Sequence, residues 1–127
     1  MPKKVLIADD QIHIRKIIAD KVSRAGYTVI TAEDGQEAVD MAKAEKPDLI
    51  IMDIMMPRMD GIEAIKILKQ YPDMANIPIL VLTAMELGDN AMELANIGIN
   101  DNNIITKPFS PKELLDTINA RIGEEQI

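Results

Sequence analysis

The chain has 127 residues, of which 47% are hydrophobic and 28% charged, and this balance predicts one ordinary globular domain. It has no cysteine and one histidine, which excludes disulfides, zinc ribbons and thiol catalysis and argues against a Ser-His-Asp triad or a His-rich metal site. The net charge of −7 argues against nucleic acid as a direct partner, because phosphate contacts need clustered lysine and arginine.

The apolar runs are too short for membrane insertion or export. None approaches the roughly 18 residues of a membrane span. The run that follows Lys3 and Lys4 is shorter than the core of about 7 residues found in signal peptides. We therefore expect a cytoplasmic protein.

The first predicted strand is the apolar run 5–8, which ends at Asp9 and Asp10. A helix follows, because apolar residues recur at close to the 3.6-residue period over residues 14–25, and Gly26 predicts its end. Either aspartate could also cap this helix.

Residues 27–31 mix threonine with apolar side chains, which suits a half-exposed edge strand. Asp34 and Glu37 have the spacing of a capping box. A second helix is therefore expected to begin there and to end before Pro47.

The run 49–53 is the stretch around which a site is expected to form. Four consecutive apolar residues that stop at Asp53 predict a strand buried on both faces. An ionised carboxylate at the end of such a strand is costly to desolvate without a partner, so Asp53 is either paired structurally or performs chemistry. Asp60 and Glu63 repeat the capping box and open a third helix, with Pro72 beyond its end.

The last part of the chain continues the alternation. Residues 79–82 predict a fully buried strand that ends at Thr83, and the helix after it is expected to carry the apolar residues of 87–95 and to end at Gly98. Residues 104–106 predict a short fifth strand.

Lys107 follows that fifth strand directly. Residues 110–113 form a third capping box, with proline at the first helical position, and open a last helix that ends at Gly123.

Five strands alternating with five helices predict an α/β fold with a parallel sheet, right-handed crossovers and helices on both faces. The doubly wound, flavodoxin-like version of this fold has the strand order 2-1-3-4-5. No linker or repeat interrupts the pattern, and only four residues follow the last helix. We therefore expect a single domain over residues 1–127, with its core at about 4–122.

In such a sheet, functional side chains gather at the carboxyl ends of the strands, near the switch in strand order. The residues at those ends are Asp9, Asp10, Asp53, Thr83 and Lys107. They converge on one point only if their strands are neighbours, as they are in the order 2-1-3-4-5.

Three clustered carboxylates repel one another, by about 4 kcal/mol for a pair ~4 Å apart at an effective dielectric constant near 20. Lys107 can offset one charge, and a raised pKa or a hard divalent cation can offset the rest. Oxygen ligands without cysteine or histidine indicate Mg²⁺, with Mn²⁺ also possible. Because Mg²⁺ binds through one or two carboxylates plus a phosphoryl oxygen, one carboxylate is left to act as a nucleophile toward phosphorus.

Four motifs make the sequence resemble the receiver domain of two-component response regulators. They are Asp9-Asp10, the stretch from Met52-Asp53 to Pro57 with Asp60-Gly61, Thr83-Ala84, and Lys107-Pro108-Phe109. The resemblance extends over residues 4 to about 122 and is specific, because all four motifs fall at predicted strand ends. It implies a phosphoryl-accepting switch rather than an enzyme, a sensor histidine kinase or histidine phosphotransfer protein as donor, and a downstream protein target.

The resemblance also implies a role for each matching residue. Asp53 would accept the phosphoryl group from a phosphohistidine. Asp10 would bind Mg²⁺ directly, Asp9 mostly through water, and Asp53 and the Met55 backbone carbonyl would complete the protein ligands. Lys107 would pair with the phosphoryl group.

In the signalling half, the resemblance implies that the Thr83 hydroxyl holds a phosphoryl oxygen and that the peptide before Pro108 is cis. Two features depart from the family. Ile104 stands where the family often has an aromatic residue, and Gly98 and Lys107 are nine residues apart, further than in the usual motif. Asn102 and Asn103 are the expected extra residues, and we expect an enlarged loop before the fifth strand and an altered output face.

Met55 and Met85 follow the expected acceptor and threonine by two residues. The resemblance implies that these two positions tune the access of hydrolytic water. Apolar side chains there would neither orient such a water nor donate to it, so we expect slow-to-moderate self-dephosphorylation. His13, on the first helix, is expected to be exposed rather than to carry a phosphoryl group.

Two other interpretations stay open. A pseudo-receiver would signal by binding alone, against which the intact set of acids argues. A flavodoxin-like cofactor-binding domain shares the topology but needs a phosphate loop rich in small residues and aromatic rings to stack the flavin. This chain instead has Asp9-Asp10-Gln11 after the first strand, no Trp, two Tyr and one Phe.

Overall fold

The computed structural model describes residues 2–83 and 90–123, in which five strands alternate with five α-helices. The elements are β1 (Lys4–Ala8), α1 (Ile12–Arg24), β2 (Thr28–Ala32), α2 (Gly35–Glu45), β3 (Leu49–Asp53), α3 (Gly61–Lys69), β4 (Ile79–Thr83), α4 (Asn90–Asn96), the 3₁₀ turn η1 (Asp101–Asn103), β5 (Ile104–Thr106) and α5 (Pro111–Ile122). Within these residues, no helix is long and apolar enough to cross a membrane.

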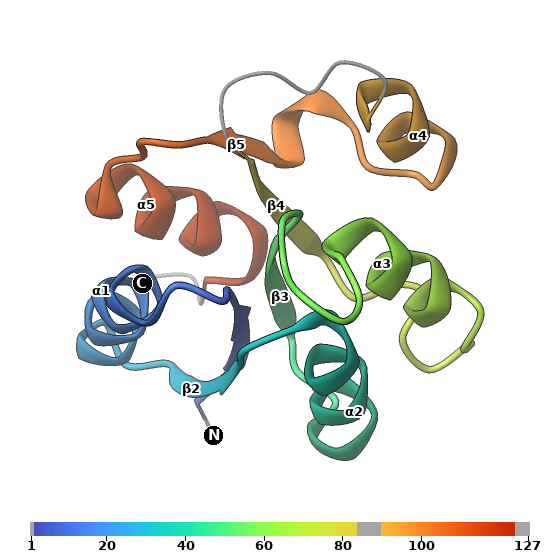
Figure 1. Ribbon diagram of the computed structural model, residues 1–127. Coiled ribbons are helices and arrows are strands. Elements are labelled where there is room, and N and C mark those ends of the chain that lie inside the picture. The colour runs from blue at the N-terminus through green and yellow to red at the C-terminus, as the bar shows by residue number, and fades with distance from the viewer. Residues whose placement is uncertain (1, 84–89, 124–127) are drawn as a thin grey trace.

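The strands form one parallel sheet in the order β2-β1-β3-β4-β5, which confirms the predicted fold class (Figure 1). Every residue of the central strands β3 and β4 is buried, which explains their unbroken apolar runs. β2 is an edge strand with exposed and half-buried residues, as its mixed composition predicts. Its register sets Lys4 opposite Thr28 and Ala8 opposite Ala32, so the strand begins and ends one residue later than predicted.

Helices cover both faces of the sheet and make two separate cores, because successive side chains of a strand point to opposite faces. Ile50 and Met52 belong to the core beneath α2, α3 and α4. Leu49 and Ile51, on the same strand, belong to the core beneath α1 and α5. Figure 1 shows α1 and α5 together on one side of the sheet and the other three helices on the opposite side.

All three predicted capping boxes contain a side-chain bond at the helix start. The Glu37 N–H donates to the Asp34 carboxylate (2.8 Å), and the Glu63 N–H donates to the Asp60 carboxylate (2.9 Å). The N–H three residues into α5 donates to the hydroxyl of Ser110 (3.3 Å). These contacts satisfy donors that a helix start leaves without a partner, so each helix begins where its sequence predicts.

The start of α1 differs from the prediction. Its N-cap is Gln11, which makes no side-chain capping bond, so neither aspartate occupies that position. Instead, the Asp9 carboxylate accepts the Gln11 N–H at 2.9 Å, in a turn just before the helix. This local bond fixes the Asp9 side chain at the end of β1.

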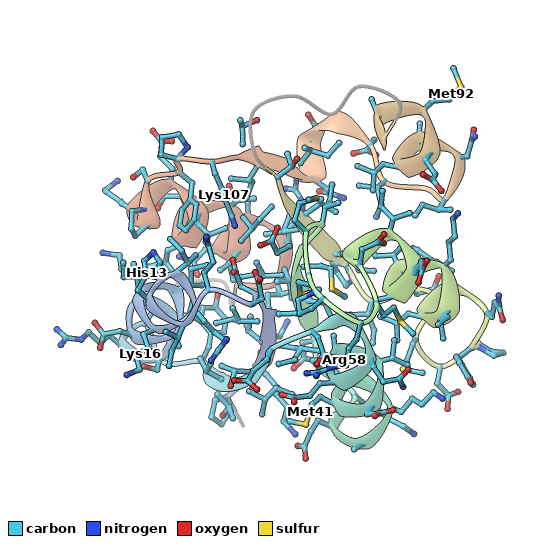
Figure 2. All side chains as sticks on the ribbon, viewed as in Figure 1. His13, Lys16, Met41, Arg58, Met92 and Lys107 are labelled. Carbon is cyan, nitrogen blue, oxygen red and sulfur yellow. The ribbon has the colours of Figure 1, made fainter. Side chains whose placement is uncertain are left out.

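The apolar residues of α1 divide between core and solvent. Ile18 and Val22 are buried, whereas Ile12 and Ile17 are 56% and 48% exposed. His13 is exposed as predicted and lies on α1 (Figure 2).

The segment before β5 contains the residues expected to enlarge the loop. The predicted start of α4 near Leu87 lies outside the described residues. Asn102 and Asn103 are part of η1, and the Arg121 guanidinium of α5 donates to the Asn102 carbonyl (3.0 Å) and to the Asn103 side chain (2.9 Å). Ile104 is half-buried against the core beneath α3. The extra residues therefore form an ordered turn, and its effect on output stays a prediction.

Candidate functional site

The carboxyl ends of β1, β3, β4 and β5 meet at one edge of the sheet. Ala8 lies opposite Met52 and Asp53 opposite Leu82 in the register, so Asp9 and Asp53 extend from adjacent strands. Lys107 follows β5 directly, and its peptide bond to Pro108 is cis, as the resemblance implies. Strand order thus brings together groups that lie far apart in the sequence.

Lys107 joins two of the predicted acids. Its ammonium lies 2.9 Å from Asp53 Oδ2 and 3.2 Å from Asp9 Oδ2. Lys107 is labelled in Figure 2. Both carboxylates are almost fully buried, whereas the lysine side chain is 19% exposed. One cation is therefore shared by two buried anions at the end of the sheet.

The pKa values of Asp53 and Lys107 are both shifted at this site. Burial raises the pKa of the Asp53 carboxyl; the hydrogen bond from Lys107 opposes the rise, and the charge of Asp9 adds to it. Burial alone would lower the pKa of the Lys107 ammonium, but its hydrogen bond to Asp53 and the two nearby carboxylates outweigh that effect and raise the pKa. Lys107 is thus held as a cation, while Asp53 is harder to ionise than an exposed aspartate.

A third carboxylate completes the cluster. Asp9, Asp10 and Asp53 each offer an oxygen within 4.8 Å of the others, and Asp10 is the exposed member. Three carboxylates beside one ammonium leave an excess of negative charge, which a hard cation would balance with ligands of the type it prefers. The donor chemistry therefore fits Mg²⁺ or Mn²⁺, and the exposed Asp10 leaves that side open to solvent.

The other two predicted site residues lie close by. Thr83 ends β4 and is buried, with 6% of the residue exposed, and its carbonyl accepts the Lys107 N–H at 2.7 Å. The Met55 N–H donates to Asp53 Oδ1 at 3.2 Å, and the Met55 side chain is 70% exposed. Met85, expected to lie near the acceptor as well, is outside the described residues.

Arg15 is a neighbour of the site that sequence reasoning did not assign to it. Its guanidinium donates to the Asp9 backbone carbonyl at 2.6 Å, and its side chain is only 11% exposed. The Arg15 guanidinium reaches this carbonyl because α1 begins close to the end of β1. The only signal in the sequence was an arginine next to Ile14 in the apolar pattern of this helix, and that pattern does not say which carbonyl the arginine reaches.

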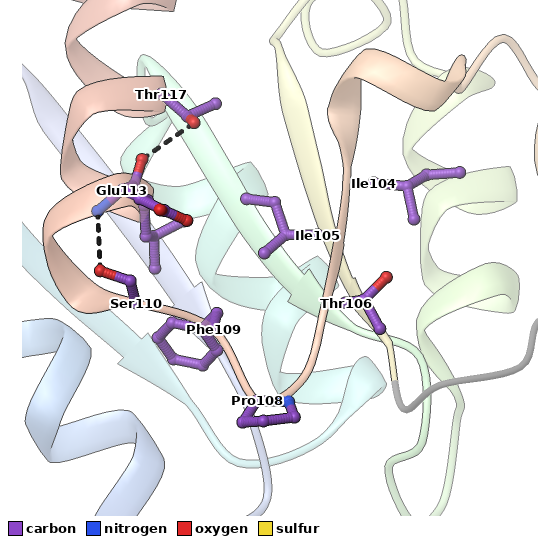
Figure 3. Close-up of a pocket in the computed structure, with 9 residues that line it drawn as sticks. Ile104, Ile105, Thr106, Pro108, Phe109, Ser110, Glu113 and Thr117 are labelled. Carbon is purple, nitrogen blue, oxygen red and sulfur yellow. Dashed lines mark hydrogen bonds between the residues drawn. The ribbon is translucent and has the colours of Figure 1, made fainter.

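A hollow of about 260 Å³ lies beside this cluster, between β5 and the first turns of α5 (Figure 3). It is lined by Ile104, Ile105, Thr106, Pro108, Phe109, Ser110, Glu113, Leu114 and Thr117. Glu113 is the single carboxylate in that lining, and its N–H and carbonyl are engaged by Ser110 and Thr117. The clustered acids and the lysine lie outside it, so the chemistry belongs to the strand ends.

Comparison with known proteins assigns the chain to a family. The family model of the response regulator receiver domain matches residues 5–119. The alkaline phosphatase synthesis transcriptional regulatory protein PhoP of Bacillus subtilis (strain 168) is 44% identical over 122 residues, which are 96% of this chain and 48% of PhoP. The probable transcriptional regulator ycf27 of Guillardia theta is 43% identical over 118 residues, 93% of this chain and 44% of that protein.

Among solved structures, the chemotaxis protein CheY4 of Vibrio cholerae superposes with a TM-score of 0.88 at 35% identity, covering 96% of this chain and 100% of CheY4. This chain spans about half the length of the curated relatives that it matches. The family match extends over most of the chain and includes the strand ends described above. The chain therefore belongs to the response regulator receiver domain family of two-component signal transduction.

Proposed function

We propose that the chain is a phosphoryl-accepting switch that depends on Mg²⁺. Asp53 is the acceptor, and a phosphohistidine on a sensor histidine kinase or a histidine phosphotransfer protein is the donor. The observation that carries this proposal is the Lys107 ammonium held between Asp53 and Asp9, with Asp10 beside them at the open edge of the sheet.

In the proposed transfer, an oxygen of ionised Asp53 forms a bond to phosphorus while the bond from phosphorus to the donor imidazole nitrogen breaks. The electron pair of that bond goes to the imidazole, and the product on this chain is an acyl phosphate. Lys107 favours the ionised form of Asp53, and its ammonium then neutralises charge on the arriving phosphoryl oxygens.

Asp9, Asp10, Asp53 and the Met55 backbone carbonyl would hold the cation. When bound, Mg²⁺ supplies positive charge that offsets both the carboxylates and the phosphoryl oxygens. Mn²⁺ fits the same oxygen ligands. The chain's own contribution is to fix these ligands in advance, through the turn at Asp9 and the Met55 N–H bond to Asp53.

After transfer, the Thr83 hydroxyl binds a phosphoryl oxygen and passes the change toward β5 and α5, where a downstream protein would bind. With Ile104 at the position of the usual aromatic residue, this coupling differs from the family pattern. The exposed Met55 side chain gives hydrolytic water no hydrogen-bond partner, which favours slow-to-moderate self-dephosphorylation. Decay of the phosphorylated form should quicken in Met55→Asn, and an unchanged lifetime would count against this role.

The partners follow from the proposed chemistry. A phosphodonor protein and a protein target are expected in the cytoplasm, and the switch would promote only its own phosphorylation and dephosphorylation rather than act as an enzyme on other molecules. Several relatives are named transcriptional regulators, and the match covers only half of their length. The expectation of no direct nucleic-acid contact is therefore limited to these acidic 127 residues.

The proposal is tested by incubating the chain with acetyl phosphate and Mg²⁺ and recording its intact mass beside Asp53→Asn. A gain of one phosphoryl group in the parent, lost in the variant and lost without Mg²⁺, is expected. No gain in a folded chain that still binds Mg²⁺, with acetyl phosphate and a phosphohistidine donor alike, would favour a phosphorylation-independent pseudo-receiver.

A further inference from the structure

The loop between β3 and α3, residues 54–60, is closed at its base beside the proposed acceptor. The Gly61 N–H donates to the Ile54 carbonyl at 2.8 Å, and the Ile54 N–H donates to the Leu82 carbonyl of β4 at 3.1 Å. Met55, whose N–H binds the Asp53 carboxylate, lies in the first part of this loop. The position of the loop therefore decides where the Met55 backbone lies relative to Asp53.

The far end of the same loop is held by the start of α2. The Gly35 N–H donates to the Met59 carbonyl at 2.9 Å. The two segments are so close that a Cβ on Gly35 would lie 2.1 Å from the Met59 oxygen. This close contact joins the far end of the loop directly to the start of α2.

Arg58 adds a charged contact to that end of the loop. Its Nε donates to Asp34 Oδ2 at 2.8 Å, and its Nη2 donates to the same oxygen. Arg58 is labelled in Figure 2. Asp34 is 2% exposed, and its other oxygen caps α2 through the Glu37 N–H. One buried carboxylate thus caps a helix and anchors the loop.

The backbone of Arg58 has an uncommon conformation. Its φ angle is +64°, in the left-handed region, which glycine adopts freely, Asn and Asp tolerate, and other residues adopt at a cost. The surrounding contacts must therefore favour the conformation, and the paired guanidinium is one of them, with its own side chain 70% exposed and its partner Asp34 buried.

We propose that Arg58 is a positioning residue: by anchoring the loop to Asp34, it holds the Met55 backbone beside Asp53 in the arrangement that binds the divalent cation. The inference rests on the proposed function of the Asp9, Asp10 and Asp53 cluster. Among the described residues, Arg58 makes no hydrogen bond or ion pair with the cluster or with Lys107, so it acts through the loop.

The test compares Arg58→Asn with Lys46→Asn. Lys46 is a matched control, because it too is a cation with a positive φ (46°) and an ion pair, here to Asp73 at 3.6 Å, at the other end of α2. Both substitutions remove one positive charge and install a residue that tolerates the left-handed conformation. Arg58→Lys restores the charge and part of the hydrogen bonding.

The first readout is the dissociation constant for Mn²⁺, measured from the electron paramagnetic resonance signal of the free ion. Loss of a positive charge should by itself tighten cation binding. If the loop no longer holds the Met55 backbone beside Asp53, cation binding should instead weaken. We expect Arg58→Asn to bind Mn²⁺ about three- to tenfold more weakly, Lys46→Asn to bind it at least as tightly as the parent, and Arg58→Lys to recover most of the loss. An unchanged or tighter constant in Arg58→Asn would overturn the inference.

Amide hydrogen exchange in the cation-free chain gives a second, independent readout. Exchange at Gly35 and Gly61 should be at least tenfold faster in Arg58→Asn, with Ile51 in β3 unchanged. If the parent neither binds Mn²⁺ nor accepts a phosphoryl group, the proposed function fails, and exchange alone then decides the anchoring: unchanged rates at Gly35 and Gly61 would refute it.

Discussion

Asp53 and Asp9 share the ammonium of Lys107, and the pKa of Asp53 at this contact makes the stability of the fold depend on pH. Burial and the neighbouring charge of Asp9 raise the pKa of Asp53 although Lys107 opposes the shift. A carboxyl whose pKa is higher in the folded chain than in the unfolded chain stabilises the fold below its unfolded pKa, and this contribution is lost as pH rises through the folded pKa. At neutral pH, without a cation, ionised Asp53 therefore destabilises the fold.

Asp53→Asn should accordingly raise the thermal unfolding midpoint of the cation-free chain at pH 7. A gain of about 1 kcal/mol would move the midpoint by roughly 4 °C for a domain of this size. Lys107 keeps Asp9 as a partner in the variant. Circular dichroism melts from pH 4 to pH 8 provide the measurement, and the difference between the two chains should shrink as pH falls. A variant less stable than its parent at pH 7 would contradict the role assigned to burial.

Sequence reasoning brought Asp9, Asp10, Asp53, Thr83 and Lys107 to one edge because parallel strands end together, and that inference needs only strand order. It could not find the contact of Arg15 with the Asp9 carbonyl, or that of Arg58 with Asp34. Each of these two contacts joins segments whose distance in space depends on how a helix or a loop crosses the sheet. The spacing of residues along the sequence does not predict that distance.

At the scale of elements, the starts of α2, α3 and α5 are well specified because capping boxes act locally, within four residues. The start of α1 was predicted less well, since Asp9 forms a turn instead of a cap. The division of α1 between core and solvent was also open, because its sequence offers more apolar residues than one face can bury. Ile12 and Ile17 remain on the outer side.

The buried cap of α2 predicts a pH-dependent loss of stability. The bond from the Glu37 N–H and then the Arg58 guanidinium lower the pKa of Asp34 below 3.8. A carboxyl with a lowered pKa stabilises the fold above its unfolded pKa, and that contribution is lost as pH falls through the folded pKa.

Asp34→Asn keeps a capping oxygen but loses the ion pair, so it should be less stable than the parent at pH 7 by about 1 kcal/mol. The difference should narrow below pH 4 in urea unfolding experiments. A constant difference from pH 7 to pH 2.5 would show that the charge of Asp34 contributes nothing.

The junction of β3 and α3 should tolerate no side chain at Gly61. A Cβ there would lie 2.2 Å from the Asp53 carbonyl oxygen and 2.9 Å from the Ile54 Cα, and backbone atoms cannot move aside cheaply. Gly61→Ala should cost about 3 kcal/mol of unfolding free energy. Gly26→Ala is the control, since nothing lies within 4 Å and only its φ of +103° is strained, at about 1 kcal/mol. Equal losses in the two variants would refute the close approach.

For the molecule as a whole, the strand order β2-β1-β3-β4-β5 defines the fold, and the motifs at the strand ends identify the family. The parallel sheet buries β3 and β4 completely and leaves the charged groups at a single edge. Cation binding at that edge is therefore expected to stabilise the entire chain, because the ligands come from strands that are distant in sequence.

Mg²⁺ should raise the unfolding free energy by about 1.4 kcal/mol for each tenfold increase above its dissociation constant. Removing the charge of Asp10 relieves its repulsion from Asp9 and Asp53, so the cation-free Asp10→Asn chain should be at least as stable as the parent. Asp10→Asn should need a higher Mg²⁺ concentration than the parent for the same increase in unfolding free energy. Asp116→Asn, an exposed acid on α5, is the control. Equal Mg²⁺ responses in all three chains would place the cation elsewhere.

The central claim is that Asp53 carries the phosphoryl group, and chemical trapping tests it most directly. The chain is treated with phosphoramidate, whose phosphorus–nitrogen bond resembles that of phosphohistidine, in the presence of Mg²⁺, and is then reduced with borohydride. Reduction of an acyl phosphate converts the aspartate to homoserine, which peptide mass mapping locates. We predict homoserine at position 53 alone. Homoserine at position 9 or 10, or none in a folded chain that binds Mg²⁺, would contradict the account.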